Sequence, residues 1–293
     1  MFADNPKDSE VHEVDLHLHT THSDGTLNPT ELVDLCARNG LKVIAISDHD
    51  STEGVEEAQA AAIKHGIEVI PAIELSTDVP DNEIHMLGYF VDMEDTGFQD
   101  LLREFRAGRE DRGRRMVERL AGLGMDITWE EVERIADGAA VGRPHIAHAL
   151  IKHGYVSEWQ EAFDKYLGRT GPAYVERTRL EPEEAVGVLL DNGALPVMAH
   201  PLYYEREDTR KLRNIVSDLK DAGMVGLEVH YGEFSESEID MLANIAAELD
   251  LIPCGGSDYH ASGKPGEIIP GEAGPPMSTV EALRAKKGVA RVS

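Results

Sequence analysis

The chain has 293 residues with 55 acidic and 28 basic side chains, and its formal net charge at pH 7 is −27. This length suffices for one large barrel or two medium domains whose core needs no disulfide. Such an acidic surface repels long polyanions, so we expect no extended binding to DNA.

Targeting and redox signals favour a soluble, cytoplasmic protein. No stretch approaches the roughly 18 apolar residues that a membrane span needs, and the first residues lack the basic and apolar regions of a signal peptide. We therefore expect no contact with a membrane. The two cysteines, Cys36 and Cys254, lie in apolar patterns typical of buried free thiols in a reducing compartment.

Strand and helix patterns alternate from residue 14 to about 92. Polar and apolar residues alternate in VDLHLH (14–19), which predicts a strand on which His17 and His19 point the same way. A helix is expected from Pro29 to the stop at Gly40, with Asn28 as its N-cap. The patterns that follow are a strand at 41–47, a helix at 54–66, and strands at 67–75 and 82–92.

Helical patterns rich in Arg and Glu replace this alternation between about 95 and 175. Alternation then resumes, with helices expected at 182–193, 208–223 and 236–250, and strands at 195–200, 225–232 and 251–258. This order favours a mainly parallel sheet. We expect a mobile leader at 1–13, one α/β barrel formed by 14–94 and 176–293, and a helical insertion or cap at 95–175.

Residue types that bind metal ions fall at nearly every expected strand end. In closed parallel α/β folds the carboxyl ends of the strands meet at one rim, so these distant side chains should converge. One histidine at a strand end is usually structural, but repetition favours a metal site, since a buried imidazole without a partner is costly. Imidazoles and carboxylates without cysteine suit manganese, zinc or iron alike. The positions are His17, His19, Asp48, His49, Glu74, His85, His200, His230, Asp258 and His260.

Motifs that carry these residues resemble those of the PHP (polymerase and histidinol phosphatase) superfamily of metal-dependent phosphoesterases. In chain order they are DLHLHTTHSDG, ISDHD, AHP and GSDYH, and they span residues 15 to 260. The resemblance implies a distorted (β/α)7 barrel with two or three divalent ions at its carboxyl rim. We expect manganese, with zinc or iron as alternatives.

The resemblance also implies a distribution of ligands over these ions. The first ion would be held by His17, His19, Glu74 and Asp258, with Glu74 bridging to a second ion. His85 and His200 would complete the second site, and Asp24, His49 and His260 would hold a third. Glu74 and Asp258 are therefore expected to be catalytic. We expect Asp48 to orient His49 from behind, as carboxylates often do around metal-bound imidazoles.

Substrate contacts are expected from one histidine and two arginines. His230 ends a strand without a metal role, so a catalytic proton-transfer or substrate contact is predicted for it. Arg143 and Arg177 flank the helical segments and are candidates for a phosphate, because guanidinium pairs bidentately with phosphate oxygens. The arginines of LLREFRAGREDRGRRMVERL alternate with acids at helical spacing, which favours a solvated, salt-bridged face over a nucleic-acid patch.

The expected chemistry is attack of metal-activated hydroxide on phosphorus. The sequence shows no Ser- or Cys-centred nucleophile motif and no P-loop.

In its size, its insertion and the motif GRPHIA, the chain resembles the branch of 3′,5′-nucleoside bisphosphate phosphatases and a 5′-to-3′ exoribonuclease. The expected substrates are thus a nucleoside 3′,5′-bisphosphate, which would lose its 3′-phosphate, and the 5′ ends of short RNA. The alternatives are a phosphatase for histidinol phosphate or another small monoester, and a non-catalytic scaffold like the PHP domains attached to DNA polymerases.

Overall fold

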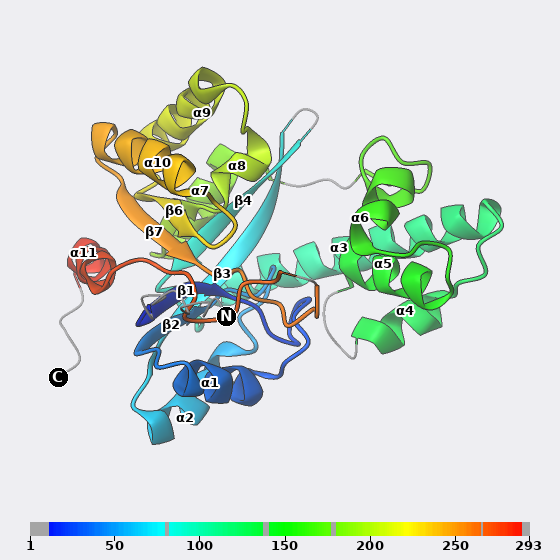
Figure 1. The fold of residues 1–293 in the computed structure, drawn as a ribbon, viewed down its shortest axis with the longest axis horizontal. Coiled ribbons are helices and arrows are strands. Elements are labelled where there is room, and N and C mark those ends of the chain that lie inside the picture. The colour runs from blue at the N-terminus through cyan, green and yellow to red at the C-terminus, as the bar shows by residue number, and fades with distance from the viewer. Residues whose placement is uncertain (1–11, 80–81, 137–140, 177–179, 265, 289–293) are drawn as a thin grey trace, which may run out of the picture.

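A sheet of seven strands forms a nearly closed barrel in the computed structural model, which describes residues 12–79, 82–136, 141–176, 180–264 and 266–288. The strands neighbour one another in chain order (Figure 1). They are β1 (Val14–Leu18), β2 (Val43–Ile46), β3 (Glu68–Val79), β4 (Asn82–Tyr89), β5 (Leu195–Met198), β6 (Gly226–Tyr231) and β7 (Ile252–Gly256). This confirms the predicted α/β barrel.

The sheet is mainly parallel, as predicted, and β4 is the exception. It pairs antiparallel with both β3 and β5, whereas the other neighbours are parallel. Only residues 80 and 81 separate β3 from β4, which is too short for the crossover that a parallel pair requires. The first and last strands meet where the Asp258 amide donates to the His17 carbonyl at 3.0 Å and the His19 amide donates to the Tyr259 carbonyl at 3.1 Å.

Helices cover the outside of the barrel in two groups (Figure 1). On one side α1 (Pro29–Arg38), α2 (Val55–Ala62) and the short η1 (Ile63–His65) lie beneath β1 and β2, and Cys36 of α1 is buried with Ile46 of β2. On the other side, Leu189 and Val216 are buried in one cluster with Leu227 of β6. The helices of this side are α7 (Pro182–Asp191), α8 (Pro201–Tyr204), α9 (Thr209–Asp221) and α10 (Glu236–Glu248), while α11 (Met277–Lys287) packs near β7. Cys36 and Cys254 are free and buried, as expected.

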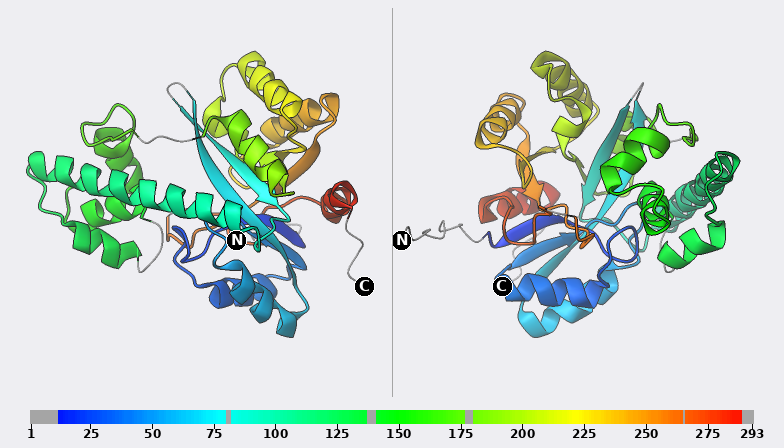
Figure 2. Two further views of the ribbon diagram at one scale, coloured as in Figure 1. Left: turned by 180° about the vertical axis from the view of Figure 1, so that it is seen from behind. Right: turned by 45° about the vertical axis from the view of Figure 1, so that its right-hand side comes forward.

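The segment between β4 and α7 is helical, as its sequence predicted. It contains α3 (Thr96–Gly122), α4 (Trp129–Ala136), α5 (Arg143–Lys152), α6 (Trp159–Ala162) and the π-helical turn η2 (Phe163–Leu167). Met116, Val132, Ile146 and Leu150 form part of a core of its own. Figure 2 shows α3 running from beside the barrel to the far end of this segment, so the long helix connects the two parts.

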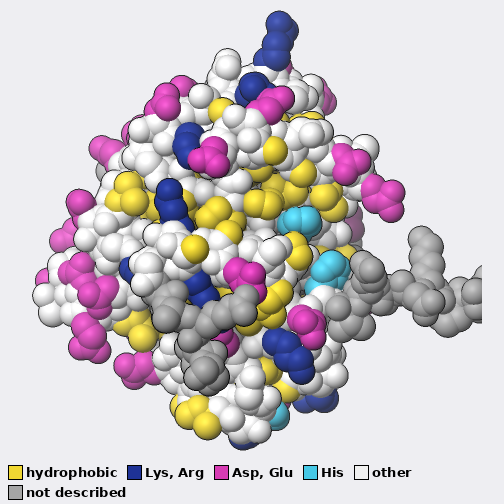
Figure 3. Space-filling model, turned by 90° about the vertical axis from the view of Figure 1, so that its left-hand side faces the viewer, with side chains coloured by type: hydrophobic (Ala, Val, Ile, Leu, Met, Phe, Trp, Pro, Cys, Tyr) yellow, Lys and Arg dark blue, Asp and Glu magenta, His cyan; other side chains and the backbone are white. Residues whose placement is uncertain are grey.

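Charges of both signs are interspersed on the face of the molecule shown in Figure 3. Asp and Glu side chains lie along much of its edge, and Lys and Arg side chains stand singly between them. This is the surface expected of an acidic chain. Across the described residues, every helix is too short or too polar to span a membrane.

The N-terminus of α10 offers a test of the local sequence signals. Ser235 and Glu238 form a capping box, in which the Glu238 carboxylate accepts from the Ser235 amide at 2.8 Å and Ser235 Oγ accepts from the Glu238 amide at 3.4 Å. Ser235→Ala should lower the free energy of unfolding by about 1 kcal/mol, measured by urea denaturation. Ser217→Ala, inside α9, is the control and should not destabilise the protein, because alanine is the better helix former. Equal effects of the two changes would contradict the capping assignment.

Candidate metal centre

Glu74 lies at the centre of a ring of imidazoles on the carboxyl rim of the barrel. Its Oε2 atom is 3.2 Å from His17 Nε2, from His19 Nε2 and from His49 Nδ1. Its Oε1 atom is 2.8 Å from His85 Nδ1 and 3.0 Å from His200 Nε2. The side chain is only 1% exposed. One buried carboxylate on β3 thus faces imidazoles that lie on or directly after β1, β2, β4 and β5.

The remaining carboxylates extend this ring. Asp258, which follows β7, has its Oδ1 atom 3.2 Å from His17 Nε2 and 3.1 Å from His19 Nε2. Asp24, in the loop after β1, lies 3.2 Å from His260 Nε2 and 3.8 Å from His49 Nε2. The strand order therefore brings together side chains that are far apart in sequence.

Three overlapping groups have their ligand atoms within 4.8 Å of one another. The first is the predicted set His17, His19, Glu74 and Asp258. The second adds His19 to the predicted Asp24, His49 and His260. The third contains His49, Glu74 and His85. His200, predicted for the same ion as His85, contacts the same Glu74 oxygen, Oε1, at 3.0 Å. All of the predicted ligands are therefore in one place.

The arrangement of these donor atoms suits the binding of divalent metal ions better than it suits hydrogen bonds among the residues themselves. His19 Nε2, His49 Nδ1 and Asp24 Oδ1 are buried and have no hydrogen-bond partner within the described residues. Each nevertheless lies 3.2 Å from a carboxylate oxygen or an imidazole nitrogen, which is close enough for a hydrogen bond although the atoms are not aligned for one. Buried polar atoms without partners are costly, and a cation shared between nitrogen and oxygen donors removes that cost. The nitrogen and oxygen set suits a borderline divalent ion.

Electrostatics hold the carboxylates in the form that binds metal. Burial would raise the pKa of Glu74, but the imidazoles of His49, His17 and His85 hold that pKa well below its usual range. Burial lowers the pKa of His49 to about 3, against the attraction of Glu74 and Asp24. Glu74 is thus ionised at pH 7, which is the form in which a carboxylate binds metal. Against the effect of burial, Glu74 raises the pKa of His85 to about 9 and Asp24 raises that of His260 to about 10.

Glu228 on β6 contacts the imidazole of His17 and the backbone of His200, and the sequence did not predict it. Its Oε1 atom lies 3.0 Å from His17 Nδ1, and its Oε2 atom accepts a 2.6 Å hydrogen bond from the His200 amide. The side chain is fully buried. An acid at an inward position of the apolar strand GLEVH was the available signal. A carboxylate behind a metal-binding imidazole fixes its tautomer and orientation.

Glu228→Gln tests this support. Replacing the carboxylate by an amide should weaken metal binding about tenfold, because His17 and His200 lose a charged partner. The measurement is a competition titration against a chromophoric chelator. Glu236→Gln, on the exposed N-terminus of α10, is the control and should bind as the wild type does. Unchanged affinity in a folded Glu228→Gln protein would remove Glu228 from the supporting role.

Asp48 does not perform the role predicted for it. Its carboxylate accepts hydrogen bonds from the Thr20 amide at 2.7 Å, from Thr20 Oγ1 at 2.6 Å and from Ser23 Oγ at 2.6 Å. In the described part of the chain no hydrogen bond links it to the His49 ring. Asp48 therefore shapes the loop that carries Asp24, and His49 is oriented by Glu74 and Asp24 themselves.

The structure does not bring His230 into the ring. The β6–β7 register shifts between Glu228 and His230, and this bulge places Tyr231 toward the rim, where its hydroxyl donates to Asp258 Oδ2 at 2.8 Å. Burial lowers the pKa of His230, and the positive charge of His12 adds to the effect. Among the described residues, no ion pair or hydrogen bond joins the His230 ring to a predicted ligand. The strand pattern could not reveal the bulge.

Arg143 lies beside the predicted metal ligands, at the start of α5. Its Nη2 atom is 2.9 and 2.8 Å from the two carboxylate oxygens of Glu83, and its guanidinium lies 5.5 Å from the centre of the Phe163 ring. Glu83 in turn lies 3.8 Å from His85 Nε2. Arg177, the second predicted substrate contact, is outside the described residues.

Two arginines of α3 correct the expectation of a solvated, salt-bridged helix face. Arg109 donates from Nε to Asp50 Oδ2 at 2.6 Å and from Nη2 to Ser76 Oγ at 2.7 Å, while Arg112 donates to the Val175 carbonyl at 2.7 Å. Because they are three residues apart, both lie on the face of α3 that turns toward the rim. The expectation of a solvated face holds for the exposed arginines 103, 114 and 115.

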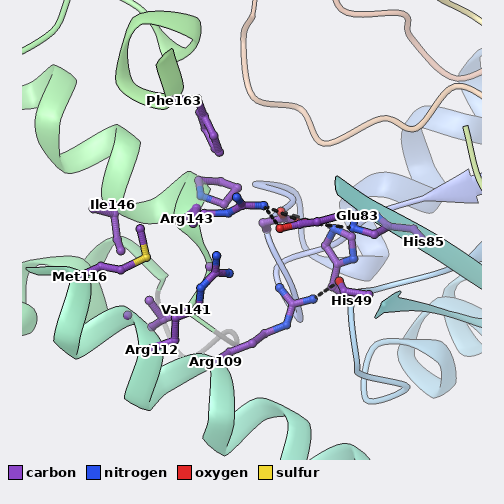
Figure 4. A pocket seen from close by; sticks show the side chains of 15 residues that line it. His49, Glu83, His85, Arg109, Arg112, Met116, Val141, Arg143, Ile146 and Phe163 are labelled. Carbon is purple, nitrogen blue, oxygen red and sulfur yellow. Dashed lines mark hydrogen bonds and ion pairs between the residues drawn. The ribbon is translucent and has the colours of Figure 1, made fainter. Parts of the chain in front are cut away.

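These arginines line a cavity of about 130 Å³ next to the metal-binding residues (Figure 4). Arg109 and Arg112 enter it from α3 and Arg143 enters from α5. On the barrel side it reaches His49, His85 and Asp24. We call it the guanidinium cavity. Three guanidinium groups of this acidic protein thus lie beside residues that could hold a metal ion.

Known proteins resemble the chain over most of its length. A 3′,5′-nucleoside bisphosphate phosphatase of Chromobacterium violaceum is 33% identical over 257 residues, which cover 87% of this chain and 90% of the relative. A 5′-3′ exoribonuclease of Haemophilus influenzae is 35% identical over 246 residues, covering 84% and 89%. A solved structure from Bifidobacterium adolescentis, described as a metal-dependent phosphoesterase, is 29% identical, superposes with a TM-score of 0.83, and covers 96% of this chain and 98% of that one.

The sequence profile of the PHP domain matches residues 15–176, from β1 to the end of the helical segment. This range contains most of the predicted ligands and includes the loop that carries Asp24. Barrel, ligand set and relatives agree with the motifs read from the sequence. The chain belongs to the PHP-domain family, and it is a metal-dependent phosphoesterase.

Proposed function

We propose that the enzyme removes the 3′-phosphate from nucleoside 3′,5′-bisphosphates and, by the same cut, releases mononucleotides from the 5′ end of short RNA. The guanidinium cavity carries this proposal, because it offers a place for a second anion beside the metal-binding residues. A simple monophosphatase needs no such place. The relatives named as a nucleoside bisphosphate phosphatase and a 5′-3′ exoribonuclease support the same substrate class.

The proposed metal ligands are the converging imidazoles and carboxylates, and manganese is the proposed ion. Bound divalent ions lower the pKa of a coordinated water and neutralise phosphate oxygens. Glu74 and Asp258 hold the site together by facing more than one imidazole each. We assign no role to His230. The full set of proposed ligands is His17, His19, Asp24, His49, Glu74, His85, His200, Asp258 and His260.

Arg143 is the proposed contact for the phosphate that is not cleaved. Glu83 pairs with its guanidinium in the wall of the guanidinium cavity, so an incoming phosphate, which is the more highly charged anion, would displace the carboxylate. Arg177 is proposed to assist.

Residues 95–175 are proposed to act as a cap, since α3 and α5 supply one wall of this cavity. We also propose a cytoplasmic location, which the free thiols of Cys36 and Cys254 favour.

A phosphate-release screen of the Mn²⁺-loaded protein tests the proposal. The substrates are adenosine 3′,5′-bisphosphate, histidinol phosphate, an aryl phosphate and a short 5′-phosphorylated RNA. We expect the highest kcat/KM for the bisphosphate, with mononucleotide release from the RNA. Preference for histidinol phosphate would contradict the bisphosphate assignment, and no turnover of any substrate would favour a scaffold role.

A further inference from the structure

A second, larger cavity of about 400 Å³ opens on the other side of the metal-binding residues. Aromatic side chains form its walls: Trp159 and Phe163 come from the helical segment, and Tyr203 and Tyr231 come from the barrel. It reaches Asp258 and His260 at its inner end. We call it the aromatic cavity. Its composition differs sharply from that of the guanidinium cavity.

The two cavities meet at a shared boundary. Asp24, Pro144 and Phe163 line both of them, so one side of this boundary is rich in guanidinium groups and the other is rich in aromatic rings. A nucleoside 3′,5′-bisphosphate has a matching shape, because its two phosphates and its base leave the ribose in three directions. With one phosphate at the metal-binding residues and one among the arginines, the base requires a third compartment.

We propose that the aromatic cavity binds the nucleobase of the substrate, an inference that rests on the proposed function and names the feature that selects nucleotides. Aromatic rings stack on the face of any base, so this contact gives affinity for nucleotides with little preference among bases. Tyr203 presents such a face, since 47% of it is exposed although its hydroxyl donates a hydrogen bond to Glu233.

The rim of the aromatic cavity is polar, as the edge of a base requires. Tyr203 donates to Glu233 Oε2 at 2.7 Å, and Lys264 Nζ lies 3.5 Å from Glu233 Oε1. Gln160 adds an amide that can donate and accept. Apolar walls with a few polar groups at the opening are typical of sites for planar ligands. Tyr231 joins this wall to the metal-binding residues through its hydrogen bond to Asp258.

Fluorescence of Trp159 provides a test that needs no turnover. The chain contains two tryptophans, and the other, Trp129, is buried in the helical core and lines neither cavity. In a Trp129→Phe protein, Trp159 is the only tryptophan. Titration of the Mn²⁺-loaded variant with adenosine 5′-monophosphate should quench its emission in a saturable way, whereas ribose 5-phosphate and inorganic phosphate should not. Equal responses to all three ligands, or none to the nucleotide, would overturn the inference.

A base-free substrate separates this inference from the proposed function. Wild-type kcat/KM should be at least tenfold higher for adenosine 3′,5′-bisphosphate than for 1-deoxyribose 3,5-bisphosphate, which lacks the base. Trp159→Ala should remove most of this difference by raising KM for the nucleotide alone, and Trp159→Phe should restore much of it. Trp129→Phe is the matched control and should retain the full difference.

The outcomes distinguish the two claims. Equal turnover of both bisphosphates by the wild type would overturn the base site and leave the proposed function standing. Turnover of neither would overturn the proposed function and the base site with it. A Trp159→Ala protein with wild-type metal content and a loss of activity equal on both substrates would place Trp159 in the structure of the helical segment and overturn its role in base binding.

Discussion

Glu74→Ala should remove metal from the enzyme and lower its kcat/KM by more than about a hundredfold. Loss of a residue that only supports a metal ligand typically costs 10- to 100-fold, and Glu74 itself faces the donor atoms. Its two oxygens lie within 3.2 Å of imidazoles from opposite sides of the ring. Elemental analysis of protein never exposed to chelator should find at least two transition-metal ions per wild-type chain and fewer in the variant. Phosphate release measures the rate.

Glu68→Gln is a matched control for this change. Glu68 begins the same strand, β3, six residues earlier, and pairs with Arg284. Its loss removes a carboxylate from the strand without touching the rim, so metal content and rate should stay at wild-type values. Glu74→Gln, which keeps the size of the side chain and loses its charge, should resemble Glu74→Ala. Full metal content and full rate in Glu74→Ala would refute the central position given to this residue.

The convergence of the proposed metal ligands could be predicted from the sequence because two periodic rules apply to them. Side chains at alternate strand positions share a face, and parallel strands end at one rim. His17 and His19 follow the first rule, and Asp258 meets them by the second. Neither rule depends on how the helices pack. For this reason the rules could predict that side chains more than 200 residues apart in the chain, such as His17 and Asp258, lie close together.

Features that depend on register or on packing could not be read in the same way. The bulge in β6 exchanges His230 for Tyr231 at the rim, and no residue type in GLEVHY marks a bulge. Glu228 looked like one more acid in an acidic chain until β6 was placed behind His17 and His200. Asp48 precedes His49 in sequence, yet its hydrogen bonds go to the loop after β1.

The arginines of α3 show the same limit for a helix. Arg109 and Arg112 have the spacing and acidic neighbours of surface residues. The sequence pattern therefore does not distinguish them from the exposed Arg114 and Arg115. Their difference arises only when α3 crosses the rim, where Asp50 and Ser76 accept hydrogen bonds from Arg109. Because of its position in the folded chain, this part of α3 lines the guanidinium cavity instead of facing solvent.

Arg143→Ala should lower kcat/KM for adenosine 3′,5′-bisphosphate by about ten- to a hundredfold, which is the usual effect of losing one charge-assisted hydrogen bond. An aryl phosphate has no second anion, so its hydrolysis should suffer less. Arg143→Lys should lie between, because an ammonium keeps the charge but cannot pair bidentately with phosphate. Steady-state phosphate release on both substrates, at equal metal content, measures the three effects. The same selective loss is expected for Arg177→Ala.

Loss of Arg143 also removes a partner of Glu83, whose carboxylate lies 3.8 Å from His85 Nε2. A negative charge released there could slow the reaction of any phosphate ester, so Glu83→Gln and the double variant separate this effect from lost substrate binding. If Arg143 binds the second phosphate, the double variant should still lose more kcat/KM on the bisphosphate than on the aryl phosphate. Arg114→Ala, in an exposed ion pair on α3, is the neutral control. Equal losses on both substrates would instead place Arg143 at the phosphoryl group under attack, and wild-type rates on both would show that its pairing with Glu83 is only structural.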